Sequence, residues 1–364
     1  MPKEEERRLV DLLKPELRLL EDEALNAEAH PHLLDEPITP FASFFIRNNG
    51  RLPEIEPKSW TLTVDGEVER TLTFTLAELA KTFEPVTITA VLECAGNGRS
   101  GFPDATSGLQ WGLGAVGCAQ WAGIRLADVL RAAGVKPKAV YTGHLSPDVQ
   151  LDGSGRAALS RGLPIEKALA PETLIAFEMN GQPLPYLHGG PLRIVAPGFP
   201  GSAWQKWLAR IWVRDREHDG AKMRGTEYRM PTVPVAPGGP IDESKFAVIT
   251  DMPVKSLITW PAENFSAAAG EIEVRGFAWS GHVPLASVAV STDGSSWLAA
   301  ELEPETHRFA WRRFRARVAA PAGPFVIMSR ATDVQGGKQP LEAPSWNPRG
   351  YCNNAVHRVK GRMA

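Results

Sequence analysis

A proline-rich segment at residues 231–240 constrains the fold of this chain more than any other sequence feature. Its ten residues, PTVPVAPGGP, include four prolines and two glycines. Proline fixes φ and lacks a backbone N–H, so this segment cannot continue a helix or a central strand. We therefore predict a domain boundary here, with one domain at residues 37–240 and a second at 241–364. A chain of 364 residues is long enough for two hydrophobic cores.

The sequence before this boundary alternates between short strands and short helices. Residues 60–64 alternate apolar and polar side chains, and Asp65-Gly66 is typical of a hairpin turn toward Leu72–Phe74. We expect residues 1–36 to form a helical lead-in with Leu9, Val10, Leu13 and Leu17 on one face. The other elements expected before the boundary are helices at 76–82, 126–133 and 165–169 and a strand at 86–92.

The sequence beyond the boundary predicts strands alone. Short alternating segments occur at regular spacing, and Asp293-Gly294 marks a turn between two of them. Over about a hundred residues this pattern favours an immunoglobulin-like β-sandwich. The predicted fold class is therefore α+β, a mixed α/β domain followed by the sandwich. The expected strands lie at 271–279, 287–291, 309–314 and 325–328.

Charge and hydropathy argue against several partners. The chain has 40 basic and 42 acidic side chains, so no overall positive field favours nucleic acid or an anionic membrane. No apolar run approaches the ~20 residues of a membrane span. The charged N-terminal residues lack the apolar core of a secretory signal. We expect a cytoplasmic protein as the chain is given, or a periplasmic one if a leader has been removed.

Cys94 is the cysteine whose surroundings suit chemistry. It follows a predicted strand and enters a loop that contains Gly96, Gly98 and Arg99. Small residues let a ligand approach the backbone, and a nearby cation favours a thiolate, a soft metal ligand. The same local composition also suits a buried, inert cysteine. Cys118 and Cys352 lack such a loop, and we interpret both as structural.

Two further groups of cationic side chains are candidates for anion binding. His188, Arg193 and Lys206 lie on neighbouring turns rich in glycine and proline, which suits a phosphate or a polar heterocycle. A structural histidine is the alternative for His188. Arg47, Arg99 and Arg349 come from three separate segments. They form an anion pocket only if the fold brings them together, and each is otherwise a surface residue.

These segments together resemble the sulfite oxidase family, over residues 39–359. The order and spacing of several short strings carry the resemblance. The matching strings are Phe45–Asn49, Glu93–Asn97, Gly108–Trp111, Ala176–Gly181, His188–Arg193, Gly276–Gly281 and Trp346–Gly350.

The resemblance implies a molybdenum–molybdopterin cofactor, with Cys94 as the protein ligand of the metal. It implies a substrate pocket around Cys94 formed by Arg47, Arg99, Trp111, Tyr228 and Arg349. Asp152 is the alternative to Asp148 at the pterin, since the spacing departs from the family there. The residues that the resemblance assigns to the pterin and its phosphate are Phe45, Ile46, Arg47, Asn48, Asn49, Asp148, His188, Arg193, Trp204, Gln205 and Lys206.

The implied activity is oxidation of sulfite to sulfate by oxo transfer, with electrons passing to an external acceptor such as a cytochrome. The implied assembly is a homodimer through the sandwich. The short segment before residue 37 leaves no room for the haem domain of the animal members, so we expect none. Asn49 replaces a histidine and Gly98 an arginine of those members, which predicts a weaker pterin contact and a less positive pocket.

Other functions stay open at this point. Nitrate reductases and sulfane dehydrogenases share the fold and the cysteine motif, and a sulfoxide is a further substrate. The arginine set Arg47, Arg99 and Arg349 favours sulfite among these. A non-catalytic cofactor-binding or interaction protein is the alternative from a different class. Retention of Cys94, His188, Arg193 and Lys206 together argues against it.

Overall fold

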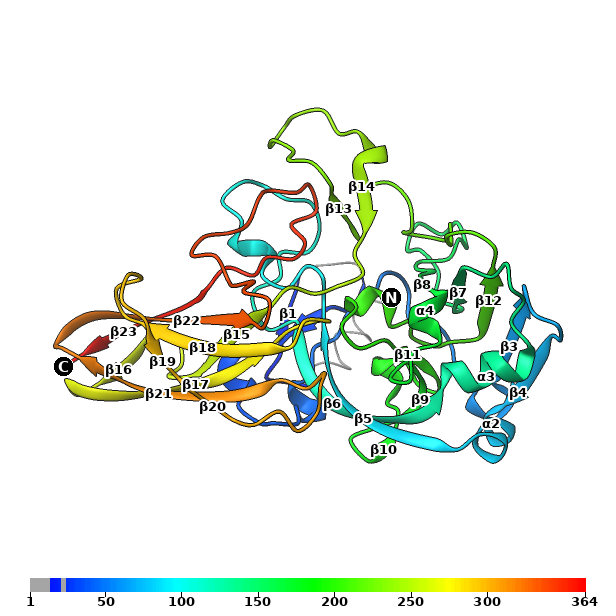
Figure 1. Ribbon diagram of the computed structural model, residues 1–364, viewed down its shortest axis with the longest axis horizontal. Coiled ribbons are helices and arrows are strands. Elements are labelled where there is room, and N and C mark those ends of the chain that lie inside the picture. The colour runs from blue at the N-terminus through cyan, green and yellow to red at the C-terminus, as the bar shows by residue number, and fades with distance from the viewer. Residues whose placement is uncertain (1–13, 21–23) are drawn as a thin grey trace.

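Two five-stranded sheets form the first of two regions that lie side by side along the long axis (Figure 1). The computed structural model describes residues 14–20 and 24–364. One sheet has the order β10-β9-β6-β5, with β11 also paired to β9, and the other has the order β4-β3-β12-β7-β8. Their elements are β3 (Thr61–Gly66), β4 (Leu72–Thr75), α2 (Leu76–Thr82), β5 (Pro85–Glu93), β6 (Val116–Arg125), α3 (Leu126–Ala133), β7 (Tyr141–Leu145), β8 (Gly162–Pro164), α4 (Ile165–Ala168), β9 (Leu174–Met179), β10 (Gln182–Pro183), β11 (Arg193–Val195) and β12 (Arg210–Arg214).

The predicted hairpin near residue 65 is present, but its turn lies elsewhere. β3 and β4 pair antiparallel, yet Asp65 and Gly66 are the last residues of β3. β12 pairs in parallel with β3 as far as Gly66, which extends the strand through both residues. A Cβ on Gly66 would lie 2.2 Å from the Val213 carbonyl oxygen, so the close approach of β12 requires glycine here.

The predicted helices of this region are confirmed. α2 begins after Thr75, whose hydroxyl and backbone form a capping box with Glu78. α3 ends at Ala133 and is followed by Gly134, whose left-handed conformation is typical of a helix C-terminus. Apolar side chains of both sheets, among them Leu62, Trp121 and Ile211, are fully buried in one core. Burial of each such side chain stabilises the fold by about 1.5–3 kcal/mol.

Two sheets that share one core form the second region. Their orders are β15-β17-β21-β20 and β16-β23-β22-β18-β19. Val274 and Phe314 from the first sheet and Val290, Ile327 and Val359 from the second belong to the same buried cluster, so the two sheets face each other. The elements are β15 (Lys255–Trp260), β16 (Phe265–Ala267), β17 (Gly270–Trp279), β18 (Leu285–Ser291), β19 (Leu298–Ala299), β20 (Glu301–Leu302), β21 (Arg312–Ala320), β22 (Gly323–Asp333) and β23 (His357–Met363).

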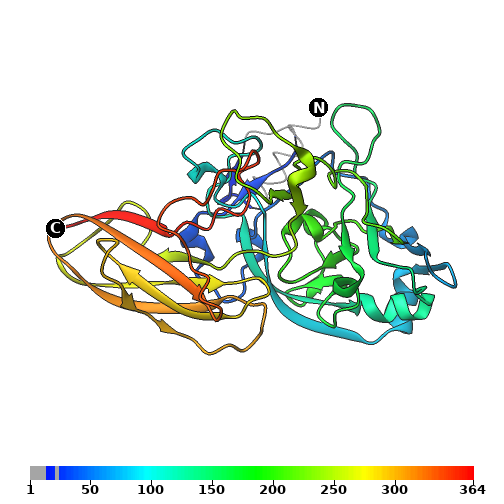
Figure 2. The same cartoon turned by 45° about the horizontal axis from the view of Figure 1, so that its top comes forward.

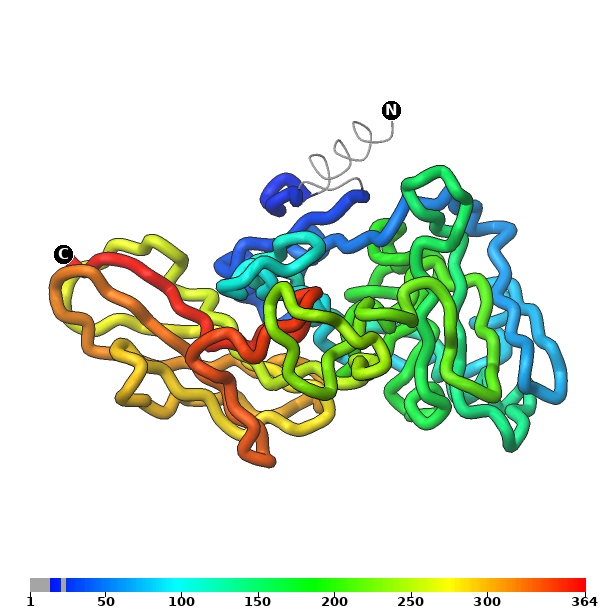
Figure 3. The backbone as a smooth tube through the Cα atoms, turned by 90° about the horizontal axis from the view of Figure 1, so that it is seen from above, coloured from blue at the N-terminus to red at the C-terminus, as the bar shows by residue number. Residues whose placement is uncertain are grey.

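Backbone and side-chain contacts join the two regions. The strand predicted at 309–314 begins only at Arg312, because the residues before it contact the first region. The Phe309 carbonyl accepts from the Val91 amide at 2.8 Å, and the Trp311 indole donates to the Pro37 carbonyl at 2.8 Å. The loop after β5 and the segment 345–353 also lie side by side between the regions (Figures 2 and 3).

The proline-rich segment is an excursion between two paired strands. β13 (Arg229–Pro231) and β14 (Phe246–Val248) pair antiparallel, and residues 232–245 connect them (Figure 1). The prolines therefore interrupt regular structure as expected. The domain bounds at residues 36 and 240 remain a prediction.

The described part of the N-terminal lead-in is not α-helical. Residues 14–20 and 24–36 contain β1 (Arg18–Leu19), β2 (Ala27–Glu28) and one short 3-10 helix. Ala27 pairs with Ile46 instead of continuing a helix. Leu9, Val10 and Leu13 lie outside the described residues. The 3-10 helices are η1 (Pro31–Leu34), η2 (Phe41–Ser43), η3 (Pro57–Ser59), η4 (Arg99–Gly101), η5 (Tyr186–His188), η6 (Gly201–Ala203) and η7 (Glu243–Lys245).

Within residues 14–20 and 24–364, none of the helices has the length and apolar character needed to cross a membrane.

Candidate functional site

The loop that carries Cys94 is held in place where it leaves β5. The Cys94 amide donates to the Ala115 carbonyl at 3.0 Å, directly after β5 ends at Glu93. The buried Glu93 carboxylate accepts from Lys255 Nζ at 2.9 Å and from the Trp279 indole at 2.8 Å. Both of these partners belong to the second region. The position of the thiol is therefore determined by both regions together.

The glycines of this loop make room for Arg99. A Cβ on Gly96 would lie 2.6 Å from Arg99 Nη2, so a larger residue would displace the guanidinium. Gly98 has a φ of +91°, which favours glycine. Arg99 Nε donates to the Arg349 carbonyl at 2.6 Å and Nη1 to the Leu109 carbonyl at 2.6 Å. Burial lowers the pKa of Arg99, and the nearby Cys94 partly offsets this effect.

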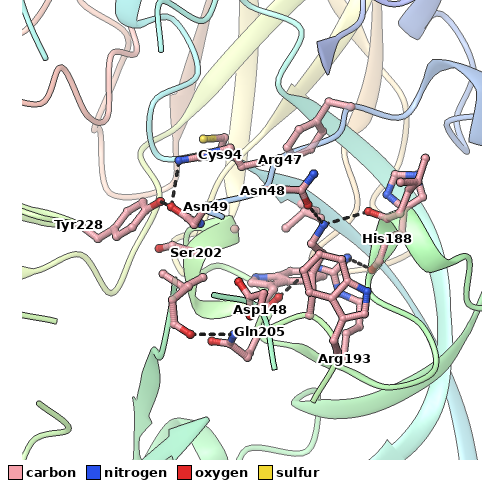
Figure 4. A pocket seen from close by; sticks show the side chains of 18 residues that line it. Arg47, Asn48, Asn49, Cys94, Asp148, His188, Arg193, Ser202, Gln205 and Tyr228 are labelled. Carbon is pink, nitrogen blue, oxygen red and sulfur yellow. Dashed lines mark hydrogen bonds between the residues drawn. The ribbon is translucent and has the colours of Figure 1, made fainter. Parts of the chain in front are cut away.

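A first chamber extends from Cys94 into the first region (Figure 4). All the residues predicted for the pterin line it except Ile46. The Ile46 side chain belongs to a different buried cluster and points away. In Figure 4, Asn49 and Tyr228 lie toward one end and His188 and Arg193 toward the other. The predicted residues that line this chamber are Phe45, Arg47, Asn48, Asn49, Cys94, Asp148, His188, Arg193, Trp204, Gln205 and Lys206.

The far end of the first chamber concentrates cationic side chains. Arg193 is buried and donates to the carbonyls of His188 at 2.8 Å and Trp204 at 3.1 Å. Lys206 donates to the Asn48 side chain and to the Leu187 carbonyl at 3.0 Å. Burial lowers the pKa of Arg193 to about 9 and holds that of Lys206 well below its usual value. The pKa of His188 is also lowered, by burial and then by its cationic neighbours.

Sequence reasoning missed Lys14 and Ser202. Lys14 is fully buried, donates to the Phe44 carbonyl at 2.7 Å, and lies 2.9 Å from His188 Nε2. Burial lowers its pKa to about 7. Ser202 lines the first chamber, and its buried hydroxyl has no hydrogen-bond partner among the described residues. Neither residue stood out in the sequence, because Lys14 lies in the charged lead-in and Ser202 in a segment rich in glycine and proline.

The two aspartates considered for the pterin lie in different environments. Asp148 is buried and lines the first chamber, where Ser146 donates to its carboxylate. Burial raises the pKa of Asp148. Asp152 is exposed and pairs with Arg156 at 2.8 Å. The geometry therefore favours Asp148.

A second chamber lies on the other side of Cys94. It brings together every residue predicted for the substrate pocket, although these come from distant parts of the sequence. Arg47, Cys94 and Tyr228 line both chambers, so the thiol lies where the two meet. The predicted residues that line the second chamber are Arg47, Cys94, Arg99, Trp111, Tyr228 and Arg349. Those that sequence reasoning missed include Lys222, Glu227 and Tyr351.

Asn49 lines the first chamber, and its side-chain oxygen accepts hydrogen bonds from residues that line the second. Asn49 Oδ1 accepts from Arg47 Nη2 at 3.0 Å, from Lys222 Nζ at 2.9 Å and from the Tyr228 hydroxyl at 3.1 Å. The sequence predicted a weakened pterin contact at this position. The structure gives Asn49 a second set of contacts, with residues that line the second chamber.

The other two cysteines have different surroundings. Cys118 is fully buried in β6, and burial raises the pKa of its thiol to about 12. Burial also raises the pKa of the Cys352 thiol to about 12. Neither residue lines the two chambers.

Two family models match this chain. Residues 49–222 match the oxidoreductase molybdopterin binding domain, and residues 246–363 match the Mo-co oxidoreductase dimerisation domain. The expected molybdopterin cofactor is thereby confirmed. The two matches also separate at the proline-rich segment that interrupts the sequence.

Curated relatives and a solved structure resemble most of the chain. Sulfite oxidase of Gallus gallus is 36% identical over 94% of this chain and 77% of its own, and that of Arabidopsis thaliana is 30% identical over 96% and 94%. Mitochondrial sulfite oxidase of Rattus norvegicus is 37% identical, and the match spans 95% of this chain but only 65% of the rat protein. The sulfane dehydrogenase SoxCD of Paracoccus pantotrophus superposes with a TM-score of 0.80 at 26% identity, covering 97% of this chain and 89% of that one. The chain belongs to the sulfite oxidase family.

Proposed function

We propose that this protein oxidises sulfite to sulfate with a molybdenum cofactor, and that the Cys94 thiolate is its ligand to the metal. One observation carries the proposal. Cys94 lies where two chambers meet, and each chamber is lined by cationic side chains. A metal at the thiol would face the pterin side and the substrate side at once. The cofactor, when bound, supplies the transferred oxygen atom and takes up two electrons.

The residues of the first chamber fit a pterin with a phosphate. Arg193, Lys206 and His188 are enclosed there, and Asp148 is the one carboxylate among the described lining residues. Burying cations without matching anions costs free energy, so an anionic ligand is needed to stabilise them. The unpartnered Ser202 hydroxyl offers one more hydrogen bond at the chamber wall. We assign the pterin to this chamber, with the phosphate at its cationic end.

The residues of the second chamber would bind and orient the oxyanion. Arginine stays charged and presents a planar set of donors, which suits an oxyanion that must leave water. Backbone carbonyls hold Arg99 in place, and Arg349 Nε donates to Thr226 Oγ1 at 3.1 Å. Trp111 forms part of the wall and excludes water, and Tyr228 directs its hydroxyl toward Asn49. These residues would place the sulfur of sulfite beside the metal at Cys94.

Sulfane sulfur is the second candidate substrate. The superposition with the sulfane dehydrogenase SoxCD favours it, since that match covers most of both chains. The three arginines of the second chamber favour a small oxyanion instead. Turnover of sulfite against a sulfane substrate under the same conditions distinguishes the two.

We also propose that the second region is an immunoglobulin-like sandwich through which the protein forms a homodimer. Its match to a Mo-co oxidoreductase dimerisation domain supports this assembly. Most such oligomers have twofold symmetry with the same surface on both subunits. Sedimentation as a monomer alone at micromolar concentration would contradict the dimer. The electrons would leave to an external acceptor such as a cytochrome.

The central test combines metal content with turnover. Molybdenum per chain is measured by mass spectrometry, and sulfite-dependent reduction of ferricyanide is measured on the same sample. We expect about one molybdenum per chain and sulfite turnover in the native protein, and loss of turnover in Cys94→Ser, because oxygen is a poorer soft-metal ligand than sulfur. Cys118→Ala is the matched control and should keep both. Molybdenum content without sulfite turnover would indicate that the protein acts on another substrate.

A further inference from the structure

The segment from Lys222 to Tyr228 has an unusual backbone. Lys222 has a φ of +64° and Tyr228 a φ of +52°, in the left-handed region that side chains other than glycine rarely adopt. Such conformations persist only where the surroundings hold them, and they cluster at functional sites. Here Arg161 Nη1 donates to the Lys222 carbonyl at 2.7 Å, and Arg229 Nε donates to the Met223 carbonyl at 2.8 Å. The fold therefore fixes the position from which the Lys222 side chain extends.

The Lys222 ammonium shares its acceptor with two other donors. Asn49 Oδ1 accepts from Lys222 Nζ at 2.9 Å, from Arg47 Nη2 at 3.0 Å and from the Tyr228 hydroxyl at 3.1 Å. A carboxamide oxygen has two lone pairs, so it cannot satisfy three donors fully. An ammonium on a flexible stem turns more readily than a planar guanidinium or a phenol. Lys222 is therefore the donor best able to leave Asn49 for an incoming anion.

The charge of the second chamber also favours a fourth cation. Arg47, Arg99 and Arg349 line it together with Glu227, which lies 3.6 Å from Arg349 Nη2. These side chains leave two positive charges, which only just match the two negative charges of fully ionised sulfite. A desolvated anion needs its charge compensated. Lys222 lines the same chamber and adds a positive charge that helps to offset the cost of removing the anion from water.

We propose that Lys222 is a substrate-binding residue that donates to the oxyanion directly. Asn49 holds the Lys222 ammonium at the chamber wall until the anion binds and replaces Asn49 as its acceptor. This inference rests on the proposed function, because it takes sulfite as the anion. The binding step itself needs no turnover, so it can be tested separately.

The test measures sulfate binding by titration calorimetry on the molybdenum-loaded protein at low ionic strength. Sulfite KM and kcat are measured alongside. In Lys222→Met we expect the sulfate Kd and the sulfite KM to rise about tenfold, the effect of losing one charge-assisted hydrogen bond, with kcat changed less than about threefold. Lys222→Arg should restore the affinity to within about threefold, because it keeps the charge. Lys58→Met, an exposed lysine on η3, is the control and should leave all three values unchanged.

Three outcomes would overturn the proposal. The first is an unchanged sulfate Kd in Lys222→Met. The second is a fall in kcat without a change in Kd or KM. The third is loss of molybdenum in both Lys222→Met and Lys222→Arg, which would show a structural role. If the native protein binds sulfate but does not turn over sulfite, the proposed function fails, while a tenfold loss of sulfate affinity in Lys222→Met still supports an oxyanion site.

Discussion

The chambers on either side of Cys94 hold their cations in different ways. In the first chamber, Arg193 is buried and donates to backbone carbonyls, and burial lowers its pKa to about 9. In the second, Arg99 is held in the same way, but Arg349 and Lys222 are partly exposed and donate to the side chains of Thr226 and Asn49. Enclosed cations without matching anions are unfavourable until an anion arrives, which suits a group that binds once and stays. Partly exposed cations keep some hydration, which suits a substrate that must bind and leave.

Lys206→Met tests the first half of this comparison and should give the largest effect. Its ammonium lies among other cations, and its pKa is held well below the usual value by burial. We expect the affinity for the cofactor to fall about 100-fold, since a charge-assisted contact to phosphate is lost. The melting temperature of the cofactor-free protein should not fall, because the variant removes a desolvated charge. Molybdenum content and thermal unfolding of the cofactor-free protein provide the two readouts.

Arg349→Gln tests the second half. It removes one cation of the second chamber and leaves the first chamber intact. We expect kcat/KM for sulfite to fall about 30-fold, the effect of losing about 2 kcal/mol of charge-assisted binding. Molybdenum content should equal that of the native protein. A variant that loses molybdenum in proportion to its activity would contradict the assignment of separate roles to the two chambers.

Lys14→Met tests how a buried lysine beside His188 makes the stability of the protein depend on pH. The pKa of Lys14 is lowered from 10.5 to about 7 by burial. Between these values the unfolded chain binds more protons than the folded one, so the free energy of unfolding rises with pH. Below about 7 the lysine is charged in both states, and above 10.5 it is neutral in both, so its contribution is constant there. The melting temperature of the cofactor-free native protein, relative to that of Lys14→Met, should therefore rise by a few degrees between pH 7 and pH 10. Bound cofactor should flatten this rise. A difference in melting temperature between the two proteins that is the same at every pH would contradict the prediction.

The sequence predicted the separate elements better than the contacts between them. α2 and α3 have local signals, a capping threonine and a C-terminal glycine, so their bounds follow from the sequence. The end of β3 does not, because β12, a strand distant in the sequence, extends it through Gly66. The described part of the lead-in was mispredicted for the same reason, since Ala27 pairs with Ile46. Tertiary pairing overrides local propensity in both cases.

In the candidate site too, the sequence predicted single residues better than the contacts between them. Cys94 and the arginines stood out as residue types, and the family resemblance supplied their grouping. Lys14 and Lys222 carried no such signal, because a lysine in a charged segment is normally a surface residue. Only the fold shows that Lys14 is buried against His188 and that Lys222 shares an acceptor with Arg47. Their contacts depend on packing between segments that no short motif records.

A comparison of Asp148→Asn with Asp152→Asn should give the smallest effects. Asp148 is the one carboxylate among the described residues that line the first chamber, and burial raises its pKa. Its replacement has two opposing consequences. It weakens an acceptor for the pterin, but it also removes a negative charge close to Lys206 and so favours the phosphate. We therefore expect cofactor retention to change only about threefold, since a neutral hydrogen bond contributes about 1 kcal/mol.

Asp152→Asn should change nothing, because the exposed Asp152 contacts Arg156 at the surface. Molybdenum content after dialysis measures both variants, and a loss confined to Asp152→Asn would reverse the assignment.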